Sequence, residues 1–157
     1  GFDLLINSWA NINTKLIIIG SGKEKNTLIK MINDKGLNEK ITIMDNVQKN
    51  ELLKYYRNAK LLIISSRDEG GPRVALEALY LEIPVVSTDV GHMSNILPKE
   101  LLANTNDLVS LQTLLEKYVD KIDTINQDAV YEFITKDFSI DEKISEIRDI
   151  YKSLLIS

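Results

Sequence analysis

Two glutamates and the short stretch between them are the part of the sequence best suited to binding a charged ligand. Glu69 precedes the run Gly70, Gly71 and Pro72, and Glu77 follows after seven intervening residues. Proline is favoured at the first position of a helix, and glycines just before it let the backbone approach a ligand closely. Because a helix start carries free N–H groups and the positive end of the helix dipole, this loop predicts a phosphate or diphosphate site. The alternative is an ordinary glycine-rich loop that caps a helix.

Glu77 needs its own explanation, because the helix around it is apolar on nearly every side. A helix of this kind is typically buried, and a buried carboxylate is costly without hydrogen-bond donors. A ribose diol supplies two hydroxyl donors of suitable size. The alternative is a salt bridge to Arg73, four residues earlier. The apolar neighbours are Val74, Ala75, Leu76, Ala78, Leu79 and Leu81.

The composition excludes several other kinds of site. The 157 residues include no cysteine and one histidine, so we expect no disulfide, no metal site and no metal or organic cofactor. A net charge of −4 argues against nucleic-acid binding. The apolar runs are too short for direct membrane insertion by this segment, and we expect a cytoplasmic chain.

Short apolar strands that alternate with helices are predicted to position these residues. This alternation is typical of a doubly wound α/β domain, Rossmann-like, with a parallel sheet and helices on both faces. The predicted strands cover 15–20, 40–44, 61–65 and 84–87, with a shorter one near 101–102. The predicted helices cover 2–12, 24–34, 50–59, 72–81, 107–123, 127–135 and 140–156, and Gly36 is expected to cap the second.

We expect residues 1–157 to form one domain with additional helices at its C-terminal end. Ligands of open α/β sheets bind beyond the carboxyl ends of the strands. The candidate cleft therefore lies at the loops that follow Gly20, Met44, Ser65 and Ser87.

The spacing of Glu69 and Glu77 resembles the Glu-x7-Glu motif of family 4 glycosyltransferases, which have two Rossmann-like domains (the GT-B fold). The motif is specific when it follows a strand and a glycine loop, as it does here. Nearly the whole chain resembles the C-terminal, donor-binding half of these proteins. The other similar segments are 1–6, 16–22, 84–91 and 136–139.

The resemblance implies a retaining, metal-independent transfer of a sugar from a nucleoside-diphosphate sugar to a glycan, lipid-linked or other acceptor. Glu69 would be the catalytic residue, contacting the donor sugar near the transferred carbon, and Glu77 would bind the ribose. The remaining positions would contact phosphate, sugar and base. They are Gly20 and Gly22 on the phosphate side, Val47 beside the nucleobase, and the backbone around Gly70, Gly71, Arg73 and Val74.

The chain also departs from this family. An arginine and a lysine that hold the diphosphate in the family would lie before Gly1, as would the N-terminal acceptor-binding domain with its membrane-leaning surface. We therefore expect a piece of a longer protein that binds nucleotide weakly and transfers nothing alone. Arg67 and Arg73 could replace part of the missing positive charge, although exposed, solvated arginines are the simpler interpretation. The segment 91–95 stands where the family commonly has a second glycine and a glutamate, and we expect its His92 to be a helix-start or surface residue rather than a general base.

Other functions fit the same pattern. A sugar epimerase or a phosphorylase with the same two-domain plan would share the fold and the cleft. A non-catalytic nucleotide-binding module, or a partner subunit that lost turnover, would keep the cleft without the reaction. A receiver-like module is disfavoured, because the predicted strands end in Gly20, Asp45, Ser65 and Thr88 rather than in an acidic cluster.

Overall fold

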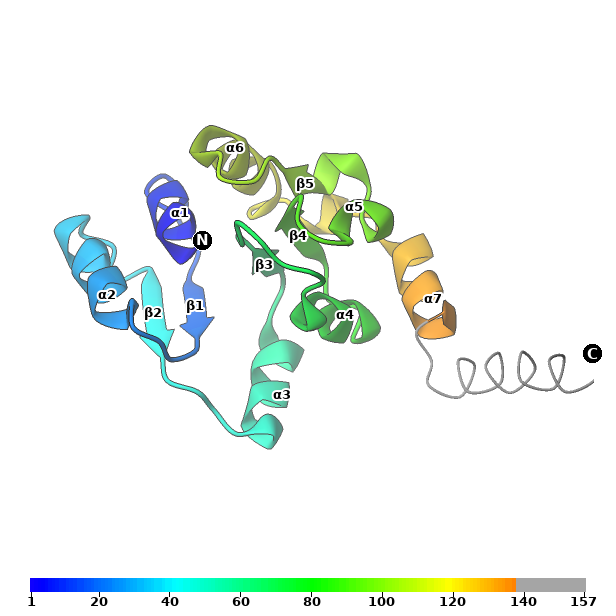
Figure 1. The fold of residues 1–157 in the computed structure, drawn as a ribbon, viewed down its shortest axis with the longest axis horizontal. Coiled ribbons are helices and arrows are strands. Elements are labelled where there is room, and N and C mark those ends of the chain that lie inside the picture. The colour runs from blue at the N-terminus through cyan, green and yellow to red at the C-terminus, as the bar shows by residue number, and fades with distance from the viewer. Residues whose placement is uncertain (138–157) are drawn as a thin grey trace, which may run out of the picture.

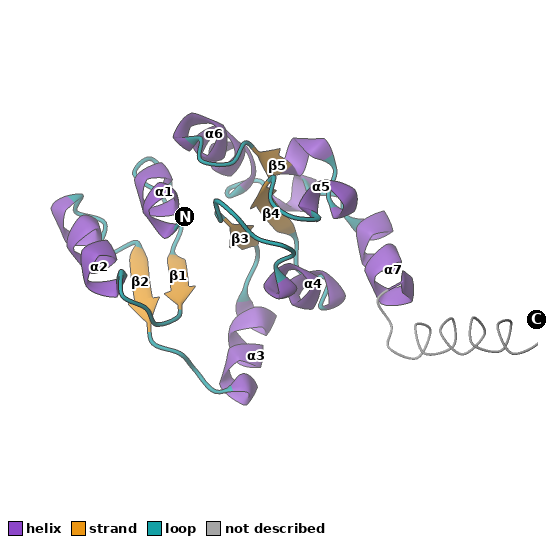
Figure 2. Cartoon of the chain, in the orientation of Figure 1, coloured by secondary structure: helices purple, strands orange, loops and turns teal. Residues whose placement is uncertain are grey.

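The computed structural model describes residues 1–137, in which strands and helices alternate along the chain (Figures 1 and 2). The predicted helix at 140–156 lies outside the described residues. The elements are α1 (Phe2–Ser8), β1 (Leu16–Ile19), α2 (Lys25–Asp34), β2 (Ile41–Met44), α3 (Lys49–Asn58), β3 (Leu62–Ile64), α4 (Arg73–Tyr80), β4 (Val85–Thr88), α5 (Met93–Ile96), β5 (Leu102–Ala103), α6 (Leu108–Tyr118) and α7 (Asp128–Asp137). Two 3₁₀ turns, η1 (Lys99–Leu101) and η2 (Ile122–Thr124), complete them.

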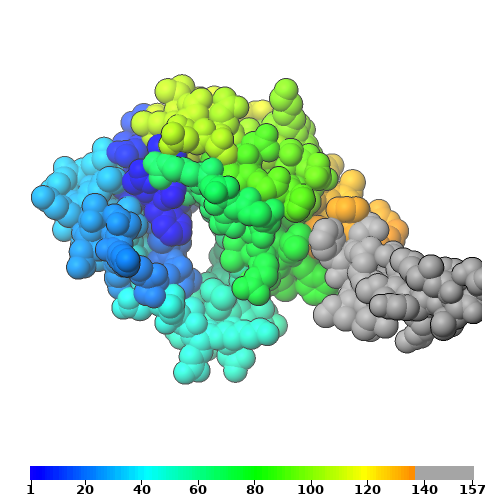
Figure 3. Space-filling view, viewed as in Figure 1, coloured from blue at the N-terminus to red at the C-terminus, as the bar shows by residue number. Residues whose placement is uncertain are grey.

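All strand pairs in the described residues are parallel, as predicted. β1 pairs with β2, β3 pairs with β4, and β4 pairs with β5. The predicted parallel sheet is present in residues 1–137 as a two-stranded sheet and a three-stranded sheet. β1 and β3 do not pair with each other. Figure 3 shows an opening through the molecule between its blue N-terminal part and its green part.

Helix α1 connects the two sheets. It packs against α2, which belongs with β1 and β2, and against α6, which follows β5. Leu5, Ile6 and the following Trp9 are almost completely buried, and the Trp9 indole N–H donates to the Thr14 carbonyl at 2.8 Å. This packing gives the two sheets a common core. The predicted helix to residue 12 ends early, because the Trp9 N–H bonds the Ile6 carbonyl in a tight turn.

The end of α2 follows the prediction made for Gly36. Gly36 has φ +65, its N–H bonds the Asn33 carbonyl, and the Leu37 N–H bonds the Ile32 carbonyl. These two bonds are the Schellman motif, in which a glycine takes the left-handed conformation after the last helical turn. The chain can then turn directly into β2.

The most buried strand, β4, is held on its far side by a side chain. Oε1 of Gln127 accepts from the Val85 N–H at 2.9 Å, and Nε2 of Gln127 donates to the Val85 carbonyl at 2.8 Å. Gln127 is 1 % exposed. β5 pairs only with Ser87 and Thr88, so Gln127 takes the place of a neighbouring strand at the beginning of β4. In residues 1–137, no helix is long and apolar enough to cross a membrane.

Candidate functional site

The loops after β1 and β2 lie side by side at the carboxyl end of their sheet. The Gly20 N–H donates to the Met44 carbonyl at 3.0 Å, and Nδ2 of Asn46 donates to Oγ of Ser21 at 2.8 Å. No atom lies within 4 Å of where a side chain at Gly20 or Gly22 would begin. The backbone here is therefore open to a ligand. Val47, half-buried, belongs to the second of these loops.

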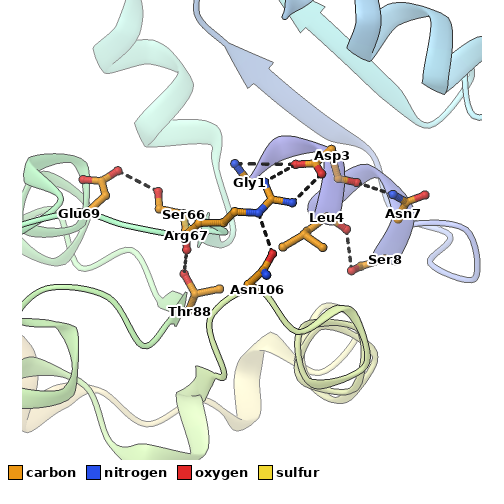
Figure 4. A network of polar contacts seen from close by, with 10 residues as sticks. All are labelled: Gly1, Asp3, Leu4, Asn7, Ser8, Ser66, Arg67, Glu69, Thr88 and Asn106. Carbon is orange, nitrogen blue, oxygen red and sulfur yellow. Dashed lines mark hydrogen bonds and ion pairs between the residues drawn. The ribbon is translucent and has the colours of Figure 1, made fainter.

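The loop between β3 and α4 is held in place by hydrogen bonds from Thr88 and Ser66, and it leaves Glu69 exposed. Oγ1 of the buried Thr88 donates to the Ser66 carbonyl at 2.7 Å, which fixes the loop to the end of β4. Oγ of Ser66 then donates to Oε1 of Glu69 at 2.8 Å. The chain of contacts Thr88, Ser66, Glu69 holds the carboxylate at the end of β3, as Figure 4 shows.

Gly91 supports the same loop from the other side, and it was not among the predicted site residues. It has φ +53, and a Cβ there would lie 2.4 Å from the Gly70 carbonyl oxygen and 2.6 Å from the Glu69 carbonyl oxygen. Only glycine fits such a contact without displacing the loop. The signal was present in the sequence as a glycine three residues after the end of β4.

Helix α4 begins one residue later than the sequence predicted. Pro72 is its extended N-cap residue, and α4 starts at Arg73. The first N–H groups of a helix have no partner within it, so those near Arg73 and Val74 form a partly positive surface beside Gly70 and Gly71. A Cβ on Gly70 would have no neighbour within 4 Å. The arrangement leaves room for an anion at the helix start.

The prediction that Glu77 is buried is wrong. Ala75, Ala78 and Leu79 form the buried side of α4, whereas Val74 is 44 % exposed and Glu77 is also exposed. The apolar residues of α4 extend around more of the helix than the side that is buried. The apolar pattern in the sequence therefore overstates how much of this helix is buried.

Glu77 has a partner that the sequence did not indicate. Tyr56, half-buried on α3, donates its hydroxyl to Oε2 of Glu77 at 2.9 Å. Burial raises the pKa of the Tyr56 phenol, and the hydrogen bond and charge of Glu77 raise it further, so Tyr56 remains a donor at neutral pH. The alternative salt bridge to Arg73 does not form between these two described residues, since Arg73 makes no ion pair within residues 1–137.

Arg67 is committed to a structural role. Its guanidinium donates to both carboxylate oxygens of Asp3, at 2.6 and 2.7 Å, and its Nε donates to Oδ1 of Asn106 at 2.8 Å (Figure 4). The Arg67 hydrogen bond lowers the pKa of Asp3 to about 2. Arg67 thus ties the loop after β3 to α1 and to the loop after β5. Of the two arginines considered, only Arg73 keeps an uncommitted charge within the described residues.

His92 precedes α5 as its N-cap residue and is exposed, as expected. Behind it lies an apolar cavity of about 230 Å³, which shares only Gly71 with the predicted site. Its lining is almost entirely apolar and offers little to a phosphate or a ribose. It consists of Gly71, Pro72, Leu76, His92, Met93, Asn95, Ile96 and Phe133. Residues 1–137 bring no three metal-ligating side chains together.

Comparison with known proteins shows the family of this chain. Residues 1–133 match the family described as glycosyl transferases, group 1. The chain is 32 % identical over 137 residues to an uncharacterized glycosyltransferase of Methanocaldococcus jannaschii, covering 85 % of this chain and 31 % of that protein. It is 33 % identical over 91 residues to the amylovoran biosynthesis glycosyltransferase AmsD of Erwinia amylovora, covering 56 % of this chain and 25 % of AmsD.

Comparison with solved structures shows that the fold is also that of glycosyltransferases. The structure of HepE from Anabaena in complex with UDP and glucose superposes with a TM-score of 0.83, at 17 % identity, over 98 % of this chain and 45 % of HepE. This chain therefore spans a third or less of the length of the two relatives named above and less than half of HepE. Its fold is the Rossmann-like half of a GT-B glycosyltransferase. With residues 1–133 matched, the chain belongs to the group 1 glycosyl transferases.

Proposed function

We propose that this domain binds a nucleoside-diphosphate sugar and that the complete protein transfers the sugar with retention of anomeric configuration. One observation carries the proposal: Glu69 and Glu77 are both exposed, at either side of the glycine-preceded start of α4. Each carboxylate uses one oxygen in a hydrogen bond within residues 1–137, to Ser66 and to Tyr56 respectively. The second oxygen of each is available to a ligand.

Each part of such a ligand has a suitable partner. The free oxygen of Glu77 accepts from a ribose hydroxyl, and that of Glu69 accepts from a hydroxyl of the donor sugar. The diphosphate lies against the first N–H groups of α4 and the open backbone of Gly20 and Gly22. Val47 lies beside the base. This assignment uses hydrogen bonds and the helix dipole and requires no metal or other cofactor.

The comparisons support the choice of ligand class. HepE is described with UDP and glucose, and AmsD acts in the biosynthesis of amylovoran. A sugar nucleotide as donor and a growing glycan or lipid-linked glycan as acceptor are consistent with both. The acceptor would bind to a second domain of the complete protein, which would work in the cytoplasm, with that domain at the membrane surface.

The transfer itself breaks the bond between the sugar C1 and the diphosphate oxygen and forms one between C1 and an acceptor oxygen. The acceptor hydroxyl proton passes to the departing diphosphate. Negative charge grows on that diphosphate as the bond breaks, and the start of α4 stabilises it there. Glu69 holds the donor sugar in position for the exchange.

A ligand-detected NMR screen of the complete protein against UDP, GDP, ADP and CMP sugars tests this proposal. We expect one nucleoside-diphosphate sugar to bind, and the product formed with an acceptor to keep the anomeric configuration of the donor. Binding of none of these would contradict it. A product with an epimerised sugar, or a sugar phosphate made from inorganic phosphate, would instead identify an epimerase or a phosphorylase.

A further inference from the structure

Helix α3 is joined to the rest of the described chain by one side-chain hydrogen bond, and that bond reaches the candidate site. The hydroxyl of Tyr56 donates to Oε2 of Glu77 at 2.9 Å. The other side-chain hydrogen bond of α3 within residues 1–137 runs from Asn58 to the Lys54 carbonyl and stays inside the helix. The contact between Tyr56 and Glu77 is therefore a specific link between α3 and α4.

Without this bond, the carboxylate of Glu77 would be free to rotate. Glu77 is exposed, and Arg73, one turn earlier on α4, makes no ion pair within the described residues. An exposed glutamate loses rotamer freedom when it binds a ligand, and this loss weakens binding by about threefold to tenfold. Tyr56 orders the carboxylate before the ligand arrives, so the ligand no longer bears that cost.

The chemistry of the two groups directs the effect of Tyr56 through Glu77. Burial, and then the hydrogen bond to Glu77, raise the pKa of Tyr56, so its hydroxyl keeps its proton at neutral pH. That single proton is used in the bond to Oε2, so Tyr56 has no donor left for a ligand. Oε1 of Glu77 remains as an oriented acceptor. Ribose hydroxyls are donors that match it.

The place of Tyr56 on α3 links two parts of the proposed site. α3 begins at Lys49, two residues after Val47, which we place beside the nucleobase. The same helix therefore follows the loop for the base at one end and holds the carboxylate for the ribose near the other. A bond that only fastened α3 to α4 could end on any polar group of α4, whereas this one ends on Glu77.

We infer that Tyr56 is a positioning residue for nucleotide binding, whose hydroxyl orients Glu77 so that Oε1 accepts from a ribose hydroxyl. This inference rests on the proposed function, in which Glu77 binds the ribose. Tyr55 offers a matched control, because it is half-buried on the same helix but its hydroxyl makes no hydrogen bond within residues 1–137.

Titration of the complete protein with UDP, GDP and ADP, and with the 2′,3′-dideoxy form of each, tests this inference. In wild type we expect at least one nucleotide to bind, and its dideoxy form to bind about tenfold more weakly or less. Tyr56→Phe should weaken binding of that nucleotide by about threefold to tenfold and leave the Kd of its dideoxy form within about twofold. Tyr55→Phe should leave both Kd values within about twofold of wild type.

A combined variant with Tyr56→Phe and Glu77→Gln gives a second readout. It should bind the nucleotide about as weakly as Glu77→Gln alone, because both substitutions remove the same interaction. Effects that multiply in the combined variant would overturn the inference. Equal weakening of both forms of the nucleotide by Tyr56→Phe would also overturn it, since a purely structural role predicts that result, and so would unchanged affinity for both.

Failure of the proposed function would appear in the wild-type protein. Binding of none of the nucleotides, or equal binding of a nucleotide and its dideoxy form, would contradict the ribose assignment itself and the inference with it. Failure of the inference alone appears only in the variants, with a wild-type protein that still prefers the nucleotide with its ribose hydroxyls.

Discussion

The hydrogen bond from Tyr56 to Glu77 explains how a carboxylate can lie on an apolar helix without burial. Tyr56 comes from α3, more than twenty residues earlier in the chain, and fixes one oxygen of Glu77 at the surface. A ligand therefore meets a carboxylate that is already oriented, which lowers the entropic cost of binding. The pairing depends on how α3 and α4 lie together, so spacing along the sequence could not reveal it.

The ion pair of Asp3 and Arg67 predicts a dependence of stability on pH. Because Arg67 holds the pKa of Asp3 at about 2 in the folded protein, below its value of 3.8 in the unfolded chain, the pair stabilises the fold above pH 4. This contribution is lost as the pH falls from about 4 to about 2. Thermal melts should show Asp3→Asn less stable than wild type at pH 7 and equal to it near pH 2.

Both side chains of this pair are 40 % exposed, so we expect a small effect that salt weakens further. Asp68→Asn is the control, because Asp68 is the next residue after Arg67 but makes no ion pair within the described chain. A difference between Asp3→Asn and wild type that persists unchanged at pH 2 would contradict the assignment.

Gly91 predicts a link between stability and binding. Alanine at φ +53 costs about 1 kcal/mol, and its Cβ would also push on the carbonyls of Glu69 and Gly70. Urea unfolding of Gly91→Ala should show a loss of about 1 to 3 kcal/mol, and nucleotide affinity should fall as the loop moves. Gly22→Ala, which meets no neighbouring atom, should stay within about 0.5 kcal/mol of wild type.

At the scale of the elements, the side chain of Gln127 makes the hydrogen bonds to Val85 that a neighbouring strand would otherwise make. Replacing it with leucine leaves the buried N–H and carbonyl of Val85 without partners, at about 1 to 3 kcal/mol for each group. Urea unfolding should therefore show Gln127→Leu less stable by about 2 to 5 kcal/mol. Gln48→Leu, at an exposed position before α3, should change the stability by less than about 0.5 kcal/mol. Equal stabilities for the two variants would be evidence against this role.

The order of strands and helices was predictable because each element has a strong local pattern. The four predicted strands are present, and the run near 101–102 proved to be the short strand β5. The short helix α5 was not among the predicted helices, although a helix start was considered at His92, because four residues give no periodic pattern to recognise. The predicted helix at 107–123 ends at Tyr118, and the turn η2 follows. Element ends are set by local hydrogen bonds, and periodicity locates them poorly.

At the scale of the whole molecule, the sequence predicted a parallel sheet, and residues 1–137 form a two-stranded and a three-stranded parallel sheet. The local patterns of β1 and β3 match a central strand equally well whether or not a neighbour is present. They could not reveal which strands pair with each other within residues 1–137. The GT-B glycosyltransferase family was predictable from the glutamate spacing in its strand and loop context, whereas family 4 membership and the acceptor remain predictions.

The central claim is that Glu77 binds the ribose of a nucleoside diphosphate at the carboxyl edge of the strands. Glu77→Gln keeps the shape of the side chain but removes the charge, and should cost about 1 to 3 kcal/mol of binding. Because Glu77 is exposed, the melting temperature should stay close to that of wild type. Glu82→Gln is the matched control, since Glu82 lies just beyond the opposite end of α4.

Isothermal titration of UDP, GDP and ADP into the complete protein and these two variants makes the decisive measurement. We expect at least one of the three nucleotides to bind, with a Kd about fivefold to a hundredfold higher in Glu77→Gln and within about twofold of wild type in Glu82→Gln. Binding of none of the three nucleotides, or equal affinities in wild type and Glu77→Gln, would contradict the claim.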